Sequence, residues 1–267
     1  MDIECRDVHR NLPKKRRRDR FGLIGRSRDF RLLWGAHSVS ALGDAVTAVA
    51  LPSVAILTLH AGGVVVGLLT AAWAIAWGAF GLVAGVWTDR LPRRRLMIAC
   101  DLARLVLLAS VPVAYAFGAL TLSQLLLVAV LGAIANVFFS TASATYVPEI
   151  LEAEDFADGN ARLELSTSTT LFAGPTLAGA LVGLVGAPLA LVADALSFLF
   201  SASLLRGIRV GHAAHRHHDQ ARGRFRRELG IGLRAIRERP ILMFTTCAGG
   251  ISNIGLSASQ AVLLLFV

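Results

Sequence analysis

The sequence predicts an all-α membrane protein, built as a bundle of six transmembrane helices followed by the beginning of a seventh. Apolar residues make up 55% of the 267 residues and charged residues only 17%, a balance far from that of an ordinary soluble domain. Long apolar stretches recur, as expected for helices that need roughly 20 such residues to cross a bilayer. A large soluble helical protein is the alternative, but its helices would show a charged face, and these stretches do not. The expected spans are 33–59, 64–87, 96–117, 123–147, 163–185 and 188–205, with a seventh beginning near Ile241.

The positive charges predict how these spans are oriented. Of the 27 Lys and Arg residues, 11 lie in 1–31, four in 89–95 and ten in 206–240, whereas the three opposite connections contain none. Because cytoplasmic loops carry the excess of Lys and Arg, we expect a cytoplasmic N-terminus and six alternating crossings. Arg outnumbers Lys 25 to 2, and Ala, Gly and Val are heavily used. This composition indicates a GC-rich bacterial genome, and hence a bacterial plasma membrane.

Four units follow from this pattern. They are a basic cytoplasmic tail (1–31), a six-span bundle (32–205), a cytoplasmic linker (206–240) and the start of a seventh span (241–267). Within the linker, residues 228–239 have the spacing of an amphipathic helix that lies on the inner membrane surface. The last residues are apolar with no charged anchor, so we expect the chain to be the first part of something longer.

Two basic or metal-binding features have competing interpretations. The run from Lys14 to Arg18 resembles a nucleic-acid arm, but beside a membrane span it favours contact with anionic lipid headgroups. We therefore expect no nucleic-acid partner. The histidine cluster between His212 and His218 has metal-binding residue types, but its Arg-rich surroundings oppose metal capture and favour a solvated loop. No cofactor and no metal site are expected.

Charges inside the predicted spans identify the candidate transport residues. A carboxylate at the bilayer centre costs at least about 2.5–3.5 kcal/mol on insertion scales, so it usually faces a cavity or a partner. Asp44 lies near the middle of the first span and is the best candidate for protonation or substrate contact, although a packing role is the alternative. His37 lies on the same helix face, where it can share a polar path with Asp44, but it is nearer the interface, where a structural role is favoured. Asp194 in the sixth span is a weaker candidate, expected either to line the mouth of the cavity or to cap a polar contact. Asn136 in the fourth span is a weaker candidate for the cavity.

Asp101 and Arg104 are three residues apart, so they share a face of the third span and can neutralise each other. We place this pair near the cytoplasmic end of the span. Asp89 follows the C-terminal end of a helix, where the helix dipole disfavours negative charge. It should therefore have a partner, such as a nearby Arg or a helix N-terminus.

Two motifs resemble those of the major facilitator superfamily. The segment Gly85-x-x-x-Asp89-Arg90-x-x-Arg93-Arg94 is similar to that family's cytoplasmic loop motif, with Pro92 where the general motif has Gly. The resemblance implies that this motif, together with Asp101 and Arg104, braces the two halves of a carrier and helps to set its gating. A role in topology alone is the alternative.

The second motif lies in the fifth span. Gly174-Pro175-x-x-Ala178-Gly179 resembles a motif associated with exporters, with Ala-Gly in place of the usual Gly-Gly. Proline removes one backbone hydrogen bond and permits a bend, and small residues let helices approach closely. The pairs Gly81/Gly85 and Gly179/Gly183 repeat this small-residue spacing.

Further segments resemble the branch of enterobactin-exporter-like and macrolide-efflux-like carriers. These are Phe30-Arg31-Leu32-Leu33-Trp34, Ser40-Ala41-Leu42-Gly43-Asp44, Asp101-Leu102-Ala103-Arg104, Asn160-Ala161 and Asp194-Ala195-Leu196-Ser197-Phe198. The resemblance implies the N-terminal half of a major-facilitator fold and a secondary active exporter of a small siderophore-like or drug-like molecule. The chain has no nucleotide-binding glycine loop, so a gradient, most simply of protons, would supply the energy.

Two alternative functions, from other classes of protein, stay open. One is a half-carrier that is inactive, or that acts only as an assembly partner, because a complete carrier would need the missing second half or a second copy. The other is a membrane-bound regulator that binds nucleic acid through its basic tail. No catalytic constellation appears, so we do not expect an enzyme.

Overall fold

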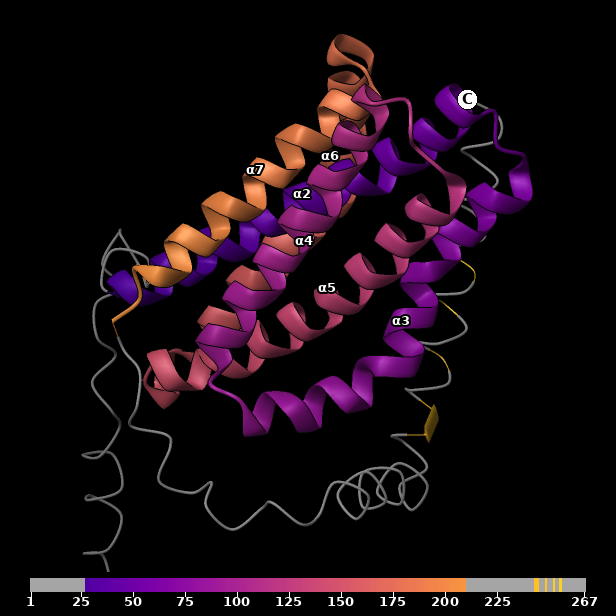
Figure 1. The fold of residues 1–267 in the computed structure, drawn as a ribbon. Coiled ribbons are helices and arrows are strands. Elements are labelled where there is room, and N and C mark those ends of the chain that lie inside the picture. Colours follow the sequence, from indigo (N-terminus) through magenta and orange to yellow (C-terminus); the bar gives the residue numbers. More distant parts are fainter. Residues whose placement is uncertain (1–26, 210–242, 245–247, 249–251, 253–254, 256–267) are drawn as a thin grey trace, which may run out of the picture.

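The structure, a computed structural model, describes residues 27–209 together with residues 243, 244, 248, 252 and 255. Most of the predicted basic tail, the linker with its histidine cluster, and most of the seventh span lie outside the described residues. Within them the fold is entirely helical, as the sequence predicts (Figure 1). The elements are α2 (Arg28–Leu59), α3 (Gly63–Arg90), α4 (Arg93–Ala116), α5 (Leu122–Ile150), the short 3-10 helix η1 (Ala153–Asp155), α6 (Phe156–Val185) and α7 (Ala187–Arg206).

Local sequence explains where several of these helices begin and end. Ser27 caps α2 by accepting a hydrogen bond from the backbone N–H of Phe30, and Thr121 does the same for α5 through Gln124. Such hydroxyl caps satisfy N–H groups that a helix leaves unpaired at its start. Gly186 separates α6 from α7 with φ of 84°, in the left-handed half of backbone space that glycine adopts at little cost.

The helices pack mainly with partners that are distant in sequence. The main packing partners of α2 are α7 and α6, those of α4 are α7 and α5, and α3 packs chiefly on α5. In Figure 1, α3 and α7 lie on opposite sides of the bundle. Consecutive helices run in opposite directions because the connections between them are short.

Two apolar clusters fill the bundle at different heights. The first includes Phe30, Met97, Phe139 and Leu205, close to the start of α2 and the end of α7. The second includes Val54, Leu108, Leu125 and Leu191, toward the other end of the same helices. Between the two clusters, four helices contribute polar side chains. We call this set the middle polar layer, and its members are Ser40, Asp44, Asp101, Arg104, Asn136 and Ser201.

The small-residue pairs do not make the helix contacts that their spacing predicted. A Cβ atom added to Gly81, Gly85, Gly179 or Gly183 would meet no atom within 4 Å in the described part of the chain. Gly174 behaves differently, because a Cβ atom there would lie 2.6 Å from the Cβ of Ala45. The close approach in the predicted bend motif is therefore made by Gly174 against α2. Gly179 is exposed, and Pro175 lies inside α6.

Candidate functional site

The middle polar layer lies halfway along the helices that form it. Asp44 is the seventeenth of 32 residues in α2, Arg104 the twelfth of 24 in α4, and Asn136 the fifteenth of 29 in α5. The sequence correctly placed Asp44 near the middle of its span. It was wrong about Arg104, which is at mid-helix and not near the cytoplasmic end, because α4 begins at Arg93 and packs at the level of Asp44.

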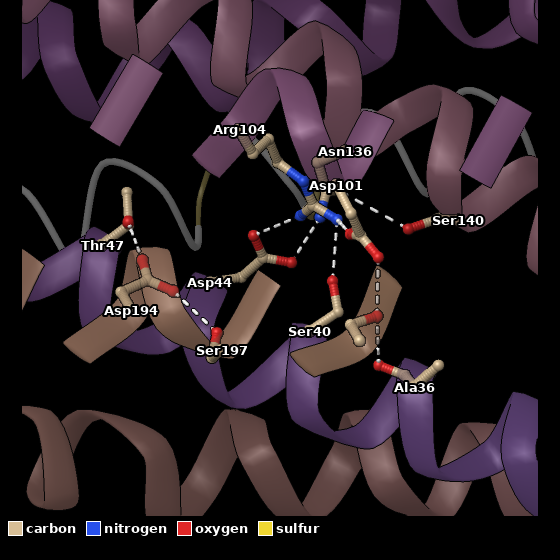
Figure 2. Close-up of polar contacts among 11 residues, drawn as sticks. Ala36, Ser40, Asp44, Thr47, Asp101, Arg104, Asn136, Ser140, Asp194 and Ser197 are labelled. Carbon is tan, nitrogen blue, oxygen red and sulfur yellow. Dashed lines mark hydrogen bonds and ion pairs between the residues drawn. The ribbon is translucent and has the colours of Figure 1, made fainter. Parts of the chain in front are cut away.

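Arg104 is the centre of this layer. Its Nη1 donates to Asp44 Oδ1 at 2.8 Å, and its Nη2 donates to Asp101 Oδ1 at 2.9 Å and to Ser40 Oγ at 2.7 Å (Figure 2). The side chain is only 2% exposed. A charge this deep needs paired carboxylates and further hydrogen bonds to be tolerated, and both are present.

Two aromatic rings cover the guanidinium. The Arg104 Cζ atom lies 4.9 Å from the ring centroid of Phe139 and 4.1 Å from that of Phe198. Cation–π contacts at these distances add stabilisation when the cation is desolvated. They also close off the guanidinium, so that ligands cannot approach it from the sides that the rings occupy.

Asp101 is the completely buried partner of Arg104. Its side chain has no exposed surface, and its second oxygen lies 2.6 Å from the Ser201 hydroxyl. That hydroxyl is also 3.1 Å from the backbone carbonyl of Ala36. The Asp101–Arg104 ion pair predicted from the i,i+3 spacing is present, and Ser201 links it to α7 and α2.

Asp44 differs from Asp101 in being partly accessible. Its side chain is 18% exposed, and its second oxygen accepts a hydrogen bond from Asn136 Nδ2 at 2.5 Å. Asn136 was singled out from sequence only as a polar residue in the fourth span. The structure brings it directly to Asp44, with the Ser140 hydroxyl 3.5 Å from its own oxygen. Asp44 is thus the partly exposed acid of a charged network that is otherwise buried.

Asp194 forms a separate contact beside the layer. Its carboxyl bonds the hydroxyls of Thr47 and Ser197 and lies against Gly43, where an added Cβ would overlap it. The side chain is 1% exposed, so it does not line an open mouth. Among the described residues, its hydrogen-bond donors are these two hydroxyl groups.

His37 joins a third polar group. Its Nε2 is 3.1 Å from the Thr167 hydroxyl and its Nδ1 is 3.3 Å from the Ser143 hydroxyl, while its ring stacks on Phe139 at 6.4 Å. His37 therefore links α2 to α5 and α6, and it shares Phe139 with Arg104. A shared polar path from His37 to Asp44 stays a prediction.

The loop between α3 and α4 gathers the predicted gating residues. Arg93 forms an ion pair with Asp89 at 3.1 Å and a second one with Glu149 at the end of α5. Asp89 thus has the partner that the helix-dipole argument required, although it lies in the last turn of α3 and not beyond it. The carbonyl of Gly85 accepts a hydrogen bond from Thr88, and Arg90 is the last residue of α3.

Arg94 has a different function in the same loop. Its Nε donates to the carbonyl of Leu205 at 2.8 Å and its Nη2 to that of Arg206 at 2.5 Å. These carbonyls are at the C-terminus of α7, where helices have unpaired acceptors and a partial negative charge. Arg94 therefore caps the C-terminus of α7.

Sequence reasoning missed several residues of this site. Ser40, Thr47, Ser197 and Ser201 bond the charged side chains, and Glu149 pairs with Arg93. Ser40 and Ser197 stand in segments that resemble known carriers, but serine and threonine are common in membrane helices, and nothing in the sequence marks any of the four as a partner of a charged side chain. Glu149 did carry a signal, because the predicted topology puts the end of the fourth span on the same side as the Arg93 loop.

The described helices and the comparisons with known proteins agree on the class of molecule. Six helices are long and apolar enough to cross a membrane. Within the described ranges, no group of three or more His, Cys, Asp or Glu side chains is arranged to hold a metal ion. No curated protein and no solved structure matches the chain. The family model of the Major Facilitator Superfamily matches residues 33–267. The chain therefore belongs to the Major Facilitator Superfamily, as a multi-pass membrane transporter and not an enzyme.

Proposed function

We propose that this chain is part of a secondary active exporter, which couples the outward movement of a siderophore-like or drug-like small molecule to proton entry. The observation that carries the proposal is the position of Asp44. It is a partly exposed carboxyl at mid-helix, bonded to a buried Arg104 and to Asn136. An ionisable group at this depth is a functional candidate by default, and transporter sites generally lie near the bilayer midplane.

The bonding of Asp44 supports a carboxyl that changes its charge during the cycle. When Asp44 is ionised, it shares the Arg104 guanidinium with Asp101. When Asp44 takes up a proton, Asp101 still balances the charge of Arg104. The ion pair between Asp101 and Arg104 uses a different guanidinium nitrogen and is fully buried. Protonation would therefore free Asp44 from α4 without leaving Arg104 as an unpaired buried charge, which would cost several kcal/mol.

Export and the enterobactin- or macrolide-exporter branch rest on the motif resemblances. A bacterial plasma membrane rests on the composition, which is rich in Arg, Ala, Gly and Val. In this proposal Gly174 and Pro175 allow α6 to bend where it touches Ala45 of α2. The N-terminus is cytoplasmic, so the Asp89, Arg93 and Arg94 loop lies on the inner face. There the ion pairs of Arg93 hold α3, α4 and α5 together, as a gating brace needs.

We also propose that the bundle acts with a second half or a second copy. Its units would be the basic tail (1–31), the six-span bundle (32–205), the linker (206–240) and the start of a seventh span (241–267). The glycine faces of α3 and α6 support this idea, since nothing within 4 Å fills them in the described part of the chain. Small-residue faces are where membrane helices approach most closely.

Reconstituted vesicles test the proposed function. The carrier, purified as the cell makes it, is placed in proteoliposomes with an imposed pH gradient, and substrate movement and proton flux are both recorded. We expect opposite fluxes that Asp44→Asn abolishes while membrane insertion is unchanged. Asp158→Asn is the matched control, because Asp158 is an exposed acid in the first turn of α6. Undiminished coupled transport by Asp44→Asn would remove Asp44 from the mechanism.

A further inference from the structure

A row of polar side chains on α5 leads from the middle polar layer toward the level at which α2 begins. Asn136, Ser140 and Ser143 follow one another at intervals of four and three residues, so they share one face of the helix. Asn136 Nδ2 donates to Asp44 at 2.5 Å, and the Ser140 hydroxyl is 3.5 Å from the Asn136 oxygen (Figure 2). At the other end of the row, the Ser143 hydroxyl is 3.3 Å from His37. The row therefore connects two ionisable residues of α2.

The two ends of this row match because α2 and α5 run in opposite directions. His37 is seven residues before Asp44 in α2, and Ser143 is seven residues after Asn136 in α5. Two helical turns, roughly 10 Å at 1.5 Å per residue, thus separate the two contacts on both helices. Ser140 divides this interval, so that polar groups occur at every turn between the middle polar layer and His37.

The contacts of His37 suit a residue that changes its protonation state. Its Nδ1 is 3.3 Å from the Ser143 hydroxyl, and its Nε2 is 3.1 Å from the Thr167 hydroxyl. A neutral imidazole has one donor and one acceptor nitrogen, an imidazolium has two donors, and a hydroxyl group can either donate or accept. Both hydrogen bonds can therefore persist when His37 gains or loses a proton.

Burial decreases from the Ser143 side of His37 to the Thr167 side. Ser143 has no exposed surface, His37 is half-buried and Thr167 is exposed. Thr167 belongs to α6, which packs chiefly on α2. A proton on His37 is therefore close to the surface of the described bundle on the α6 side, whereas the Ser143 side leads inward to Asp44.

Charged residues on the surrounding helices act on any proton that His37 binds. The imidazole stacks on Phe139 at 6.4 Å, and the Arg104 Cζ atom lies 4.9 Å from the centroid of the same ring. The charge of Arg104 opposes a second positive charge nearby, so His37 suits a place where a proton passes and not one where it stays. Further ionisable residues on these helices are Arg31 and Asp44 on α2, Asp101 on α4, Tyr146 on α5, Glu164 on α6 and Arg206 on α7.

We propose that His37 carries the transported proton between the middle polar layer and the α6 side of the bundle. This inference rests on the proposed function and names the route by which a proton leaves Asp44. Asp44 is partly exposed, and water molecules held by the amide of Asn136 and the hydroxyls of Ser140 and Ser143 pass its proton to His37 Nδ1. Chains of acids and histidines serve as proton relays in other membrane proteins.

The charges balance at each step of this route. A neutral Asp44 and a neutral His37 become a carboxylate and an imidazolium, so the first transfer adds no net charge to the membrane interior. The imidazolium then releases its Nε2 proton to water beside the Thr167 hydroxyl and is neutral again. The middle polar layer is left with Asp44 ionised and hydrogen-bonded to Arg104, as in the structure.

Time-resolved infrared spectroscopy of the full carrier in lipid nanodiscs tests this route without a substrate. A pH jump changes the protonation of Asp44, whose band is identified by its absence from Asp44→Asn. His37→Asn and His37→Gln keep an amide that can hydrogen-bond to a hydroxyl, but an amide does not carry a proton. We expect both variants to slow the protonation change of Asp44 by about a hundredfold, within the range for a positioned proton-transfer group. Imidazole added to the buffer should restore part of the rate.

His60→Asn is the matched control. His60 is exposed at the C-cap of α2 with φ of 51°, a conformation that asparagine tolerates, and its replacement should leave the rate at Asp44 unchanged. An unchanged rate in both His37 variants would overturn the inference. A slower rate that imidazole does not restore would also overturn it, because it would give His37 a structural role alone. The same holds if Asp44 does not respond to the pH jump.

Vesicle flux separates this inference from the proposed function. If His37→Gln retains a full proton-coupled flux that Asp44→Asn abolishes, the exporter function stands and the route through His37 is wrong. If Asp44 exchanges its proton through His37 but no substrate moves in the vesicles, the route is as inferred and the exporter function is wrong.

Discussion

Arg104 and Asp44 meet at 2.8 Å between the midpoints of α4 and α2. The two residues are 60 positions apart in sequence, and one is buried while the other is partly exposed. Asp101 holds the opposite side of the same guanidinium at 2.9 Å. Arg104 thus has one permanent and one accessible partner, and this asymmetry underlies the predictions that follow.

Replacing Arg104 should destabilise the bundle strongly. Arg104→Met would leave Asp44 and Asp101 as two buried acids without a base, and breaking a buried pair in this way costs about 3–5 kcal/mol. We expect a lowered thermal unfolding temperature in detergent and loss of transport. Arg95→Met is the control, because Arg95 is exposed at the start of α4, and its effect should be small. Equal unfolding temperatures for the two variants would contradict the central position of Arg104.

Asp101→Asn and Asp44→Asn should have different consequences although each removes one acid. Asp101 is fully buried and bonded to Ser201, so its loss should lower the unfolding temperature more than the loss of Asp44. Asp44→Asn should instead leave stability less affected and abolish proton-coupled transport. Thermal unfolding and vesicle transport, measured side by side, check this division. A reversed order of stabilities would show that the permanent partner of Arg104 is Asp44.

Asp194→Asn should retain most of the transport activity. The contacts of Asp194 are with the hydroxyls of Thr47 and Ser197, each on a different carboxylate oxygen. A neutral amide can accept a hydrogen bond from one hydroxyl through its oxygen and donate one to the other through its NH2 group. Asp194→Leu should lower stability by about 1–3 kcal/mol, because the two half-buried hydroxyls would lose their partner. Proton flux and unfolding temperature are the measurements. Loss of coupling in Asp194→Asn with normal stability would instead make Asp194 a second proton carrier.

Gly43→Ala should disturb the contact between α2 and α7. The added methyl would overlap the Asp194 carboxyl and the Ser197 hydroxyl, and overpacking of this kind typically costs about 1–3 kcal/mol. Gly78→Ala is the matched control, since a methyl group on Gly78 meets no atom within 4 Å. The difference between their unfolding temperatures measures the effect. Identical unfolding temperatures would mean that α7 can move away from α2 without a loss of stability.

Glu149→Gln should alter transport more than stability. Glu149 and Arg93 are each about one-fifth exposed, and ion pairs of partly exposed groups contribute only about 1 kcal/mol or less. If this pair helps to set the gating equilibrium, the transport rate should change several-fold while the unfolding temperature stays within a few degrees. Glu154→Gln, at an exposed acid in η1 just after α5, provides the comparison. Unchanged transport would limit the pair to a packing role.

The sequence by itself determined the class and the membrane spans of this protein, and it predicts their orientation. Apolar length and basic loops depend only on local composition, so α2 to α7 begin and end within a few residues of the predicted spans, apart from α6, whose first turns are polar. The sequence also predicts the ion pair Asp101–Arg104, because residues three apart share a helix face, and the helix-dipole argument predicts a partner for Asp89.

Only the tertiary structure decided which of these groups act together. Helix packing is non-sequential, with α4 between α5 and α7 and with α2 against α6 and α7. Which faces meet depends on side-chain fit across the whole bundle, and no local spacing encodes it. For that reason the sequence identifies Asp44, Arg104 and Asn136 as candidates, but it does not predict that these residues, from three different helices, are in contact. Their depth and their unequal exposure, on which the proposed chemistry depends, arise from the packing of the helices around them.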